Sequence, residues 1–246
     1  MQNLLTRQSR WSAKLDLAQS LSGLLLVLFM WAHMFLVSSI LISQEAMYRV
    51  VKLFEGYYFF GRSYPWLVSV AVTGVLGLIV LHAGLALRKF PQSTRQYQLF
   101  LGHKWRMQHS DTSLWWWQVV TGFAMLFLAP MHLFGMFSQP DQIGPYASAW
   151  RVYSTHWPLY LILLFAVELH GAIGLYRLGL KWLSIESLPV ALLRRRLRWL
   201  KWGLSAFFII LGLCTLLAYY QLGTGLQDRP GLRYQSAQPA AEELQP

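Results

Sequence analysis

The sequence predicts an all-α membrane protein, a membrane-spanning bundle of five transmembrane helices. Of its 246 residues, 55% are hydrophobic and only 13% are charged, whereas soluble domains carry about 25% charged residues. Five apolar stretches of 20 to 24 residues are each long enough to cross the ~30 Å hydrocarbon layer of a bilayer. Glu168 is the one Asp, Glu, Lys or Arg within them. A β-barrel is excluded, because its strands would alternate polar and apolar residues over segments of about ten.

The predicted spans divide the chain into three parts. Residues 1–18 form a cytoplasmic N-terminal segment, residues 19–222 the five-helix membrane domain, and residues 223–246 an extracytoplasmic tail. The first span is not a cleaved signal peptide, because its apolar run is too long and no small-residue cleavage site follows it. The five spans are Gln19–Ile42, Trp66–Leu87, Leu114–Phe137, Trp157–Tyr176 and Trp202–Leu222.

The segments between the spans predict their orientation. The side of the membrane that holds the N-terminus receives 15 of the 21 Lys and Arg residues, and the opposite side receives 6. Because cytoplasmic loops are enriched in Lys and Arg, we expect the N-terminus in the cytoplasm and the C-terminus outside. The net charge of +11 is therefore mostly topological. We expect the lipid bilayer to be a partner of the chain, and we expect no nucleic acid as a partner.

Four of the seven histidines lie inside the predicted spans, one in each of the first four. One histidine on an apolar helix is usually a packed residue, but ionisable groups inside a membrane are costly and tend to be functional. In the predicted orientation, two histidines lie roughly 8–14 Å below the outer edge and two roughly 8–9 Å below the inner edge. The outer pair is His33 with His132, and the inner pair is His82 with His170.

Two imidazoles from two helices at one level are the axial ligands that a six-coordinate haem b requires. A zinc or di-iron site would gather its ligands at one level and would usually include carboxylates, which do not accompany these histidines. We therefore predict two haems b, one iron held by each pair. Small residues one helical turn from a ligand would make room for the macrocycles: Gly135, Ala166, Gly174 and Ala86.

Two haems at two levels would carry electrons between the faces of the membrane. The single cysteine, Cys214, excludes an iron–sulfur cluster held by this chain alone, so the electron partners must come from elsewhere. A quinone is the natural lipid-soluble partner, and the basic inner face suits a soluble electron-transferring subunit. Two alternatives stay open: the cytochrome b of a membrane hydrogenase or formate dehydrogenase, and a proton-coupled transporter using His and Glu. Transporters favour broken helices and internal repeats, and neither is evident.

Nine motifs carry a specific resemblance between about Ala13 and about Leu222. They are AKLDLAQSLSGL, FMWAHMFLVSSILIS, KLFEG, LHAGLALRKFP, RQYQLF, HSDTSLWW, TGFAMLFLAPMHLF, QIGP and LLFAVELHGAIGLYRL. With these motifs the sequence resembles the dihaem cytochrome b subunit of quinol:fumarate reductase, the membrane anchor of succinate dehydrogenase/fumarate reductase complexes.

The resemblance implies more than the residues show by themselves. In that family the four intramembrane histidines are the haem ligands, paired as depth alone pairs them. The family implies a bacterial inner-membrane location, cytoplasmic flavoprotein and iron–sulfur subunits, and a dimer of heterotrimers. It also implies menaquinol as electron donor and fumarate as the distant acceptor, with no fumarate chemistry on this chain. Both directions, fumarate reduction and succinate oxidation by a quinone, stay open.

Two glutamates are candidate catalytic residues. Glu55, in KLFEG on the outer side, would alone be a solvated loop residue, but it matches the family's base for quinol oxidation. Glu168 lies two residues before His170, about 200° round the helix, so it points away from that ligand. It would make a helix–helix hydrogen bond or, as its family counterpart does, relay protons.

Five further residues are candidate contacts of the haem propionates. Gln19, Ser20, Trp115 and Lys181 lie at the inner boundary and match family positions that contact the inner haem. Arg151 is the sole basic residue of its outer loop and suits an outer propionate.

Overall fold

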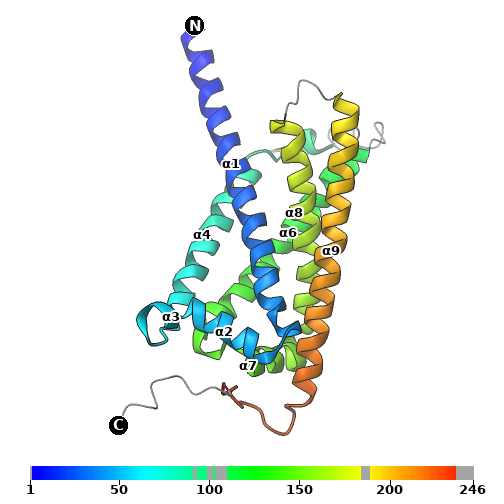
Figure 1. The fold of residues 1–246 in the computed structure, drawn as a ribbon. Coiled ribbons are helices and arrows are strands. Elements are labelled where there is room, and N and C mark those ends of the chain that lie inside the picture. Colours follow the sequence, from blue (N-terminus) through cyan, green and yellow to red (C-terminus); the bar gives the residue numbers. More distant parts are fainter. Residues whose placement is uncertain (1, 91–92, 99–101, 103–109, 184–188, 237–246) are drawn as a thin grey trace. The chain divides into compact units, whose positions relative to one another are not determined.

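The computed structural model of the chain describes residues 2–90, 93–98, 102, 110–183 and 189–236 (Figure 1). Within these ranges the chain is helical and forms no strand. Five helices are long and apolar enough to cross a membrane. They are α1 (Gln2–Val37), α4 (Trp66–Leu87), α6 (Ser110–Ser138), α8 (Trp157–Trp182) and α9 (Val190–Thr224). The predicted all-α fold with five membrane helices is confirmed.

The helices extend beyond most of the predicted spans. Only α4 keeps its predicted bounds. Helix α1 begins at Gln2 instead of Gln19, and α9 begins at Val190 instead of Trp202. Leu, Arg, Lys and Gln are good helix formers, so the helix continues past the end of the apolar stretch that predicts it.

Short helices occupy two segments that the sequence treats only as connections. Helices α2 (Gln44–Phe54) and α3 (Tyr57–Phe60) follow α1, and α7 (Pro145–Arg151) precedes α8. A π-helical turn, Val152–His156, joins α7 to α8. A search for long apolar runs cannot find such helices, because only one of their faces is apolar.

The chain divides into two compact units, each with its own packing. Unit 1 comprises Met1–Met30, Gly74–Leu126 and Ala166–Ala206, and unit 2 comprises Trp31–Thr73, Phe127–Phe165 and Phe207–Pro246. In unit 1, a Cβ atom added at Gly171 of α8 would lie 3.0 Å from Val27 Cγ2 of α1. Small residues of this kind let two membrane helices approach closely. The neighbouring Ala172 and Ile173 are buried in the same packing.

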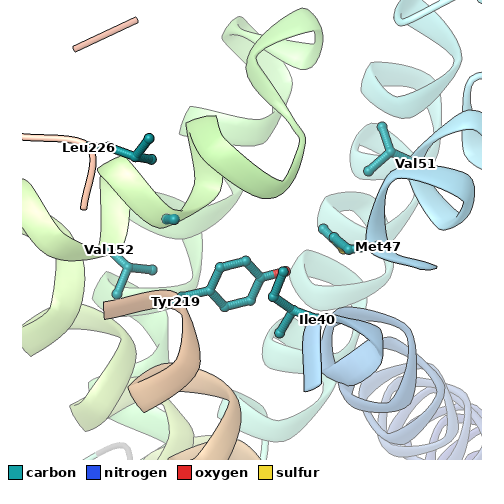
Figure 2. Close-up of a cluster of buried hydrophobic side chains, with 7 residues drawn as sticks. Ile40, Met47, Val51, Val152, Tyr219 and Leu226 are labelled. Atoms are coloured by element: carbon teal, nitrogen blue, oxygen red, sulfur yellow. The ribbon is translucent and has the colours of Figure 1, made fainter. Parts of the chain in front are cut away.

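A buried apolar cluster holds unit 2 together (Figure 2). Its members come from the 3₁₀ turn Ser38–Leu41 that follows α1, from α2, from α7 and the π-helical turn, and from α9 and the residues that follow. They are Ile40, Met47, Val51, Ala149, Val152, Tyr219 and Leu226. Polar links accompany the cluster, since the hydroxyls of Ser38 and Thr215 lie 2.7 Å apart. This packing fixes α2 against the rest of the unit.

The two ends of α2 have distinct signals. At its start, the Ser43 side chain accepts a hydrogen bond from the Ala46 amide at 2.9 Å, which satisfies a free donor of the first turn. At its end, Gly56 has a φ of +76°, a conformation that glycine adopts without strain. The chain therefore turns sharply just after Glu55. The Tyr64 amide donates to the Glu55 carbonyl at 2.8 Å and closes the loop.

Candidate functional site

The first histidine pair lies in unit 1. His82 of α4 and His170 of α8 have ring centroids 6.4 Å apart. The His170 Nδ1 atom lies 2.8 Å from the Gln118 carbonyl oxygen, which can only accept, so Nδ1–H is the donor. The Ser22 hydroxyl donates to the Gln19 carbonyl at 3.1 Å and is 3.0 Å from His82 Nδ1, so it accepts there. Both imidazoles are thus assigned a lone pair on Nε2, the arrangement of metal-ligating histidines.

Two glycines make room for these imidazoles. A Cβ atom at Gly23 of α1 would lie 2.8 Å from His82 Cε1, and one at Gly122 of α6 would lie 2.9 Å from His170 Cε1. Both distances are shorter than van der Waals contact, so the side chain of any residue other than glycine at either position would collide with the imidazole ring. Each ring lies between the acceptor of its Nδ1–H hydrogen bond and the backbone of a glycine.

The second pair lies in unit 2. His33 of α1 and His132 of α6 have ring centroids 6.1 Å apart. The Tyr160 ring meets the His132 ring edge-on at 5.4 Å between centroids. The Nδ1 atom of His132 is buried and has no hydrogen-bond partner among the residues that the structure describes. Such an atom is rare in a protein interior and is typical of functional sites.

The geometry of both pairs fits a haem iron. A metal between two trans imidazoles, at metal–nitrogen distances of about 2 Å, sets the ring centroids roughly 6 to 6.5 Å apart. In the described part of the chain, no group of three or more His, Cys, Asp or Glu side chains could hold a metal ion by itself. A metal at either pair therefore needs further ligands from outside the chain, and a porphyrin supplies four nitrogens. The residues present fit haem b.

The four predicted contacts of the inner propionates all lie in unit 1. Ser20 Oγ donates to the Asp16 carbonyl at 2.8 Å and accepts from Trp182 Nε1 at 3.0 Å. Lys181 Nζ lies 3.4 Å from Asp16 Oδ2. The Asp16 carboxylate also binds Arg88 at 2.8 Å and Lys89 at 2.9 Å, so three cations gather there.

Other contacts are recorded for Gln19 and Trp115. Gln19 Oε1 is buried and accepts no hydrogen bond from the described residues. The Trp115 ring lies 6.4 Å from the Phe90 ring. Their assignment to a propionate remains a prediction from the sequence, as does that of Ser20 and Lys181.

Arg151 lies in unit 2 at the end of α7. Its guanidinium donates to the Gln142 carbonyl at 2.9 Å and contacts Met136 Sδ at 3.8 Å. It also lines a cavity of about 240 Å³ together with His156, Arg229 and Arg233. This basic cavity suits an anionic group, which agrees with the predicted propionate role without testing it.

Glu55 is buried rather than solvated. Its residue is 4% exposed, although it lies at the end of α2 beside a tight turn. Its Oε2 atom accepts a hydrogen bond from Lys52 Nζ at 2.6 Å. The expectation of a solvated loop residue, drawn from the residue alone, is therefore wrong. Glu55 follows helix α2, whose apolar face packs into unit 2 through Met47 and Val51. Long apolar runs in the sequence do not reveal this helix.

Glu168 is also buried, at 1% exposure, in α8 within unit 1. Ala172, one turn later on the same helix, is equally buried, while Phe165 on another face is exposed. A carboxyl group at such a position in a membrane helix is a functional candidate by default.

Comparison with known proteins gives the family. A model of the succinate dehydrogenase/fumarate reductase transmembrane subunit matches residues 101–212. A fumarate reductase cytochrome b subunit of Helicobacter pylori strain J99 is 55% identical over 217 residues, 88% of this chain and 84% of the relative. One of Wolinella succinogenes is 48% identical over 229 residues, 93% of this chain and 89% of the relative. The chain belongs to the fumarate reductase cytochrome b subunits.

As a fumarate reductase cytochrome b subunit, the chain is a multi-pass membrane component of an enzyme complex in electron transport. The resemblance drawn from the motifs is confirmed. A cytochrome b subunit implies haem b, in agreement with the fit of the histidine pairs. Membership in this family excludes the hydrogenase and transporter alternatives.

The sequence reasoning missed the residues that hold the imidazoles in this cytochrome b subunit. The sequence points to small residues on the ligand's own helix as room for the macrocycles. A Cβ at Gly135 would meet no atom within 4 Å, so that space is open, and one at Gly174 would approach Gln118 Nε2. The close approaches come from Gly23 and Gly122, on neighbouring helices. A glycine beside a polar residue in an apolar span, as in Ser22–Gly23 and Thr121–Gly122, is the signal that could have found them.

Proposed function

We propose that the chain oxidises menaquinol and passes its electrons through two haems b to iron–sulfur and flavoprotein subunits, which reduce fumarate. The proposal rests on the two histidine pairs. Each pair joins two helices, and its ring centroids lie 6.1 or 6.4 Å apart. When bound, each haem iron accepts and passes on one electron at a time. The chain itself carries out no fumarate chemistry.

The residues around each pair hold the ligands in place. Neutral imidazoles would bind the iron, and the hydrogen bonds that Nδ1–H of His82 and of His170 donates fix the ring orientation and leave Nε2 as the atom that would hold the metal. Lys181, Ser20, Gln19 and Trp115 would bind the propionates of one haem, and Arg151 those of the other. These contacts would neutralise charge that is otherwise costly in a membrane.

Glu55 is the proposed proton acceptor for quinol oxidation. Menaquinol releases two electrons and two protons per turnover, so a base near the quinol is required. The burial of Glu55 and its ion pair with Lys52 support the assignment, because they hold one carboxylate at a fixed position that is largely shielded from water. In the predicted topology this site faces the outside of the inner membrane.

Glu168 is the proposed proton relay that accompanies the electrons inward. Its support is its burial in α8 and its place as the one acidic residue within the predicted spans. The N-terminus and the Arg-rich segments would face the cytoplasm, where the basic surface suits the soluble subunits. Assembly as a dimer of heterotrimers is part of the same proposal.

The proposal is tested on the whole complex, purified with its soluble subunits. Menaquinol analogue should reduce haem b, and added fumarate should reoxidise it, as followed by visible absorption. Failure of fumarate to reoxidise quinol-reduced haem would reject the proposed path. Replacing fumarate with an inert dicarboxylate is the control, and it should leave the haem reduced.

A further inference from the structure

Lys52 makes three separate contacts through one ammonium group. Its Nζ atom lies 2.6 Å from Glu55 Oε2 and 2.9 Å from Ser63 Oγ, and 5.3 Å from the centre of the Tyr48 ring. Tyr48 and Glu55 belong to α2 or its end, whereas Ser63 belongs to the loop before α4. A flexible lysine side chain held at three points is strongly oriented.

The Lys52–Glu55 pair is more buried than a typical surface ion pair. The side chains are 22% and 5% exposed, compared with 55% and 28% for the Arg49–Glu45 pair on the same helix. An exposed pair contributes little because water screens it. Removing one partner of a buried pair leaves an uncompensated charge, which then tends to be neutralised by protonation.

The elements packed against α2 bring few other charges. The 3₁₀ turn Ser38–Leu41 has no ionisable side chain, and α3 contributes Tyr57 and Tyr58. The residues after α9 contribute Tyr234, whose ring lies 5.5 Å from the Tyr48 ring, and Arg233, which pairs with Asp141 at 3.0 Å. Helix α7 carries one basic residue, Arg151, whose guanidinium is bound to the Gln142 carbonyl. In the loop before α4, Arg62 lies over the Tyr64 ring at 5.8 Å. Among the residues that the structure describes, Lys52 is therefore the cation that pairs with Glu55.

We propose that Lys52 is a positioning residue for quinol oxidation, which holds Glu55 ionised and aimed as the proton acceptor. The proposal rests on the proposed role of Glu55. As menaquinol gives up two electrons to the haems and becomes menaquinone, its two hydroxyl protons must leave, and the Glu55 carboxylate takes them one after the other as the two O–H bonds of the quinol break. After each transfer the ammonium of Lys52 favours loss of the proton to the solvent outside, which restores the carboxylate. Ser63 keeps the ammonium in place between turnovers.

The first test compares three variants of the complete complex. Lys52→Met removes the charge and keeps most of the unbranched side chain, and we expect menaquinol-linked kcat to fall roughly 10- to 100-fold. Lys52→Arg restores a cation and should recover most of the loss. Arg49→Met removes the exposed cation on the same helix and should stay within about twofold of the wild type. Dye-linked fumarate reduction and haem content should be unchanged in all three.

The second test asks whether Lys52 acts on the protonation of Glu55 rather than on folding. Redox-induced infrared difference spectra report the C=O stretch of a protonated carboxyl group. Lys52→Met should gain such a band in the resting oxidised enzyme, and the double variant Lys52→Met/Glu55→Gln should lack it. Wild-type quinol turnover in Lys52→Met, or a lowered turnover without the new band, would overturn the positioning role.

Failure of this inference is distinct from failure of the proposed function. If Glu55→Gln oxidises menaquinol at the wild-type rate, Glu55 is not the base and both ideas fall. If Glu55→Gln is inactive while Lys52→Met behaves as the wild type, the base assignment stands and only the positioning role is rejected.

Discussion

At the scale of single residues, the glycines Gly23 and Gly122 leave the space that the His82 and His170 rings occupy. Gly122 lies against His170, where a Cβ atom would come within 2.9 Å of the imidazole. Gly122→Val should therefore displace the ring and cause loss of one of the two proposed haems. Gly203→Val is the matched control, because Gly203 lies on an exposed face of α9 where a Cβ meets no atom within 4 Å. Haem content per chain measures both, and equal content in the two variants would contradict the tight approach.

Glu55 is tested by removing its charge alone. Glu55→Gln keeps the size of the side chain but cannot accept a proton, so menaquinol-linked turnover should fall roughly 10²- to 10⁴-fold. Both haems and dye-linked fumarate reduction should persist. Glu45→Gln, an exchange of the same kind at the first turn of α2, should leave quinol turnover near the wild-type rate. Normal quinol oxidation by Glu55→Gln would refute the assignment.

At the scale of elements, the residues after α9 are bound to the start of α2. The Glu45 carboxylate accepts hydrogen bonds from Tyr234 at 3.1 Å and from Ser236 at 3.0 Å, and pairs with Arg49. The hydrogen bond from Arg49 holds the pKa of Glu45 below its ordinary value. The resulting stabilisation is present above the unfolded pKa and is lost as the pH falls through the lower, folded pKa.

The contacts of Glu45 with Arg49, Tyr234 and Ser236 form an ion-pair clasp between α2 and the residues after α9. The clasp predicts that acid releases the residues after α9. Near neutral pH, backbone amides around residue 234 should be protected from hydrogen exchange, and the protection should be lost in acid, once the pH falls through the lowered pKa of Glu45. Glu45→Gln should abolish the step between these conditions, because no charge remains to titrate. Protection that is independent of pH in the wild type would contradict the clasp.

The elements also show which features a sequence can predict. Long apolar runs identify α1, α4, α6, α8 and α9, because crossing a bilayer demands length and hydropathy together. This criterion does not identify helix α2, because only one face of that helix is apolar. The burial of Glu55 at its end is therefore not predicted from the sequence. The pairing of histidines follows from depth, which a helix encodes at a fixed rise per residue. The approaches of Gly23 and Gly122 depend on the rotation of one helix about another, which local sequence does not specify.

At the scale of the whole molecule, the proposed electron flow across the membrane would move net charge. Moving one elementary charge against the membrane potential costs about 2.3 kcal/mol per 100 mV. Two uncompensated electrons against ~150 mV would cost about 7 kcal/mol on that scale. A proton path that runs inward with the electrons cancels the charge movement, and Glu168 is the acidic residue that the predicted spans contain.

Glu168→Gln tests that compensation. The amide preserves a structural hydrogen bond, so both haems and dye-linked activity should remain, while menaquinol-linked turnover should be lost in sealed, energised vesicles. Glu45→Gln serves again as the control, because its carboxylate lies in the segment outside the predicted spans. Turnover at the wild-type rate by Glu168→Gln under these conditions means that Glu168 does not relay protons.

The proposed function requires each histidine pair to hold one haem b. Pyridine haemochrome quantitation on the purified chain measures this directly, and we predict two haems per chain. His82→Ala or His170→Ala should leave one haem, and His33→Ala or His132→Ala should leave the other, distinguishable by its midpoint potential. His156→Ala, at the π-helical turn, should retain both. One haem or none in the wild type, or loss of the same haem from variants of both pairs, would contradict the claim.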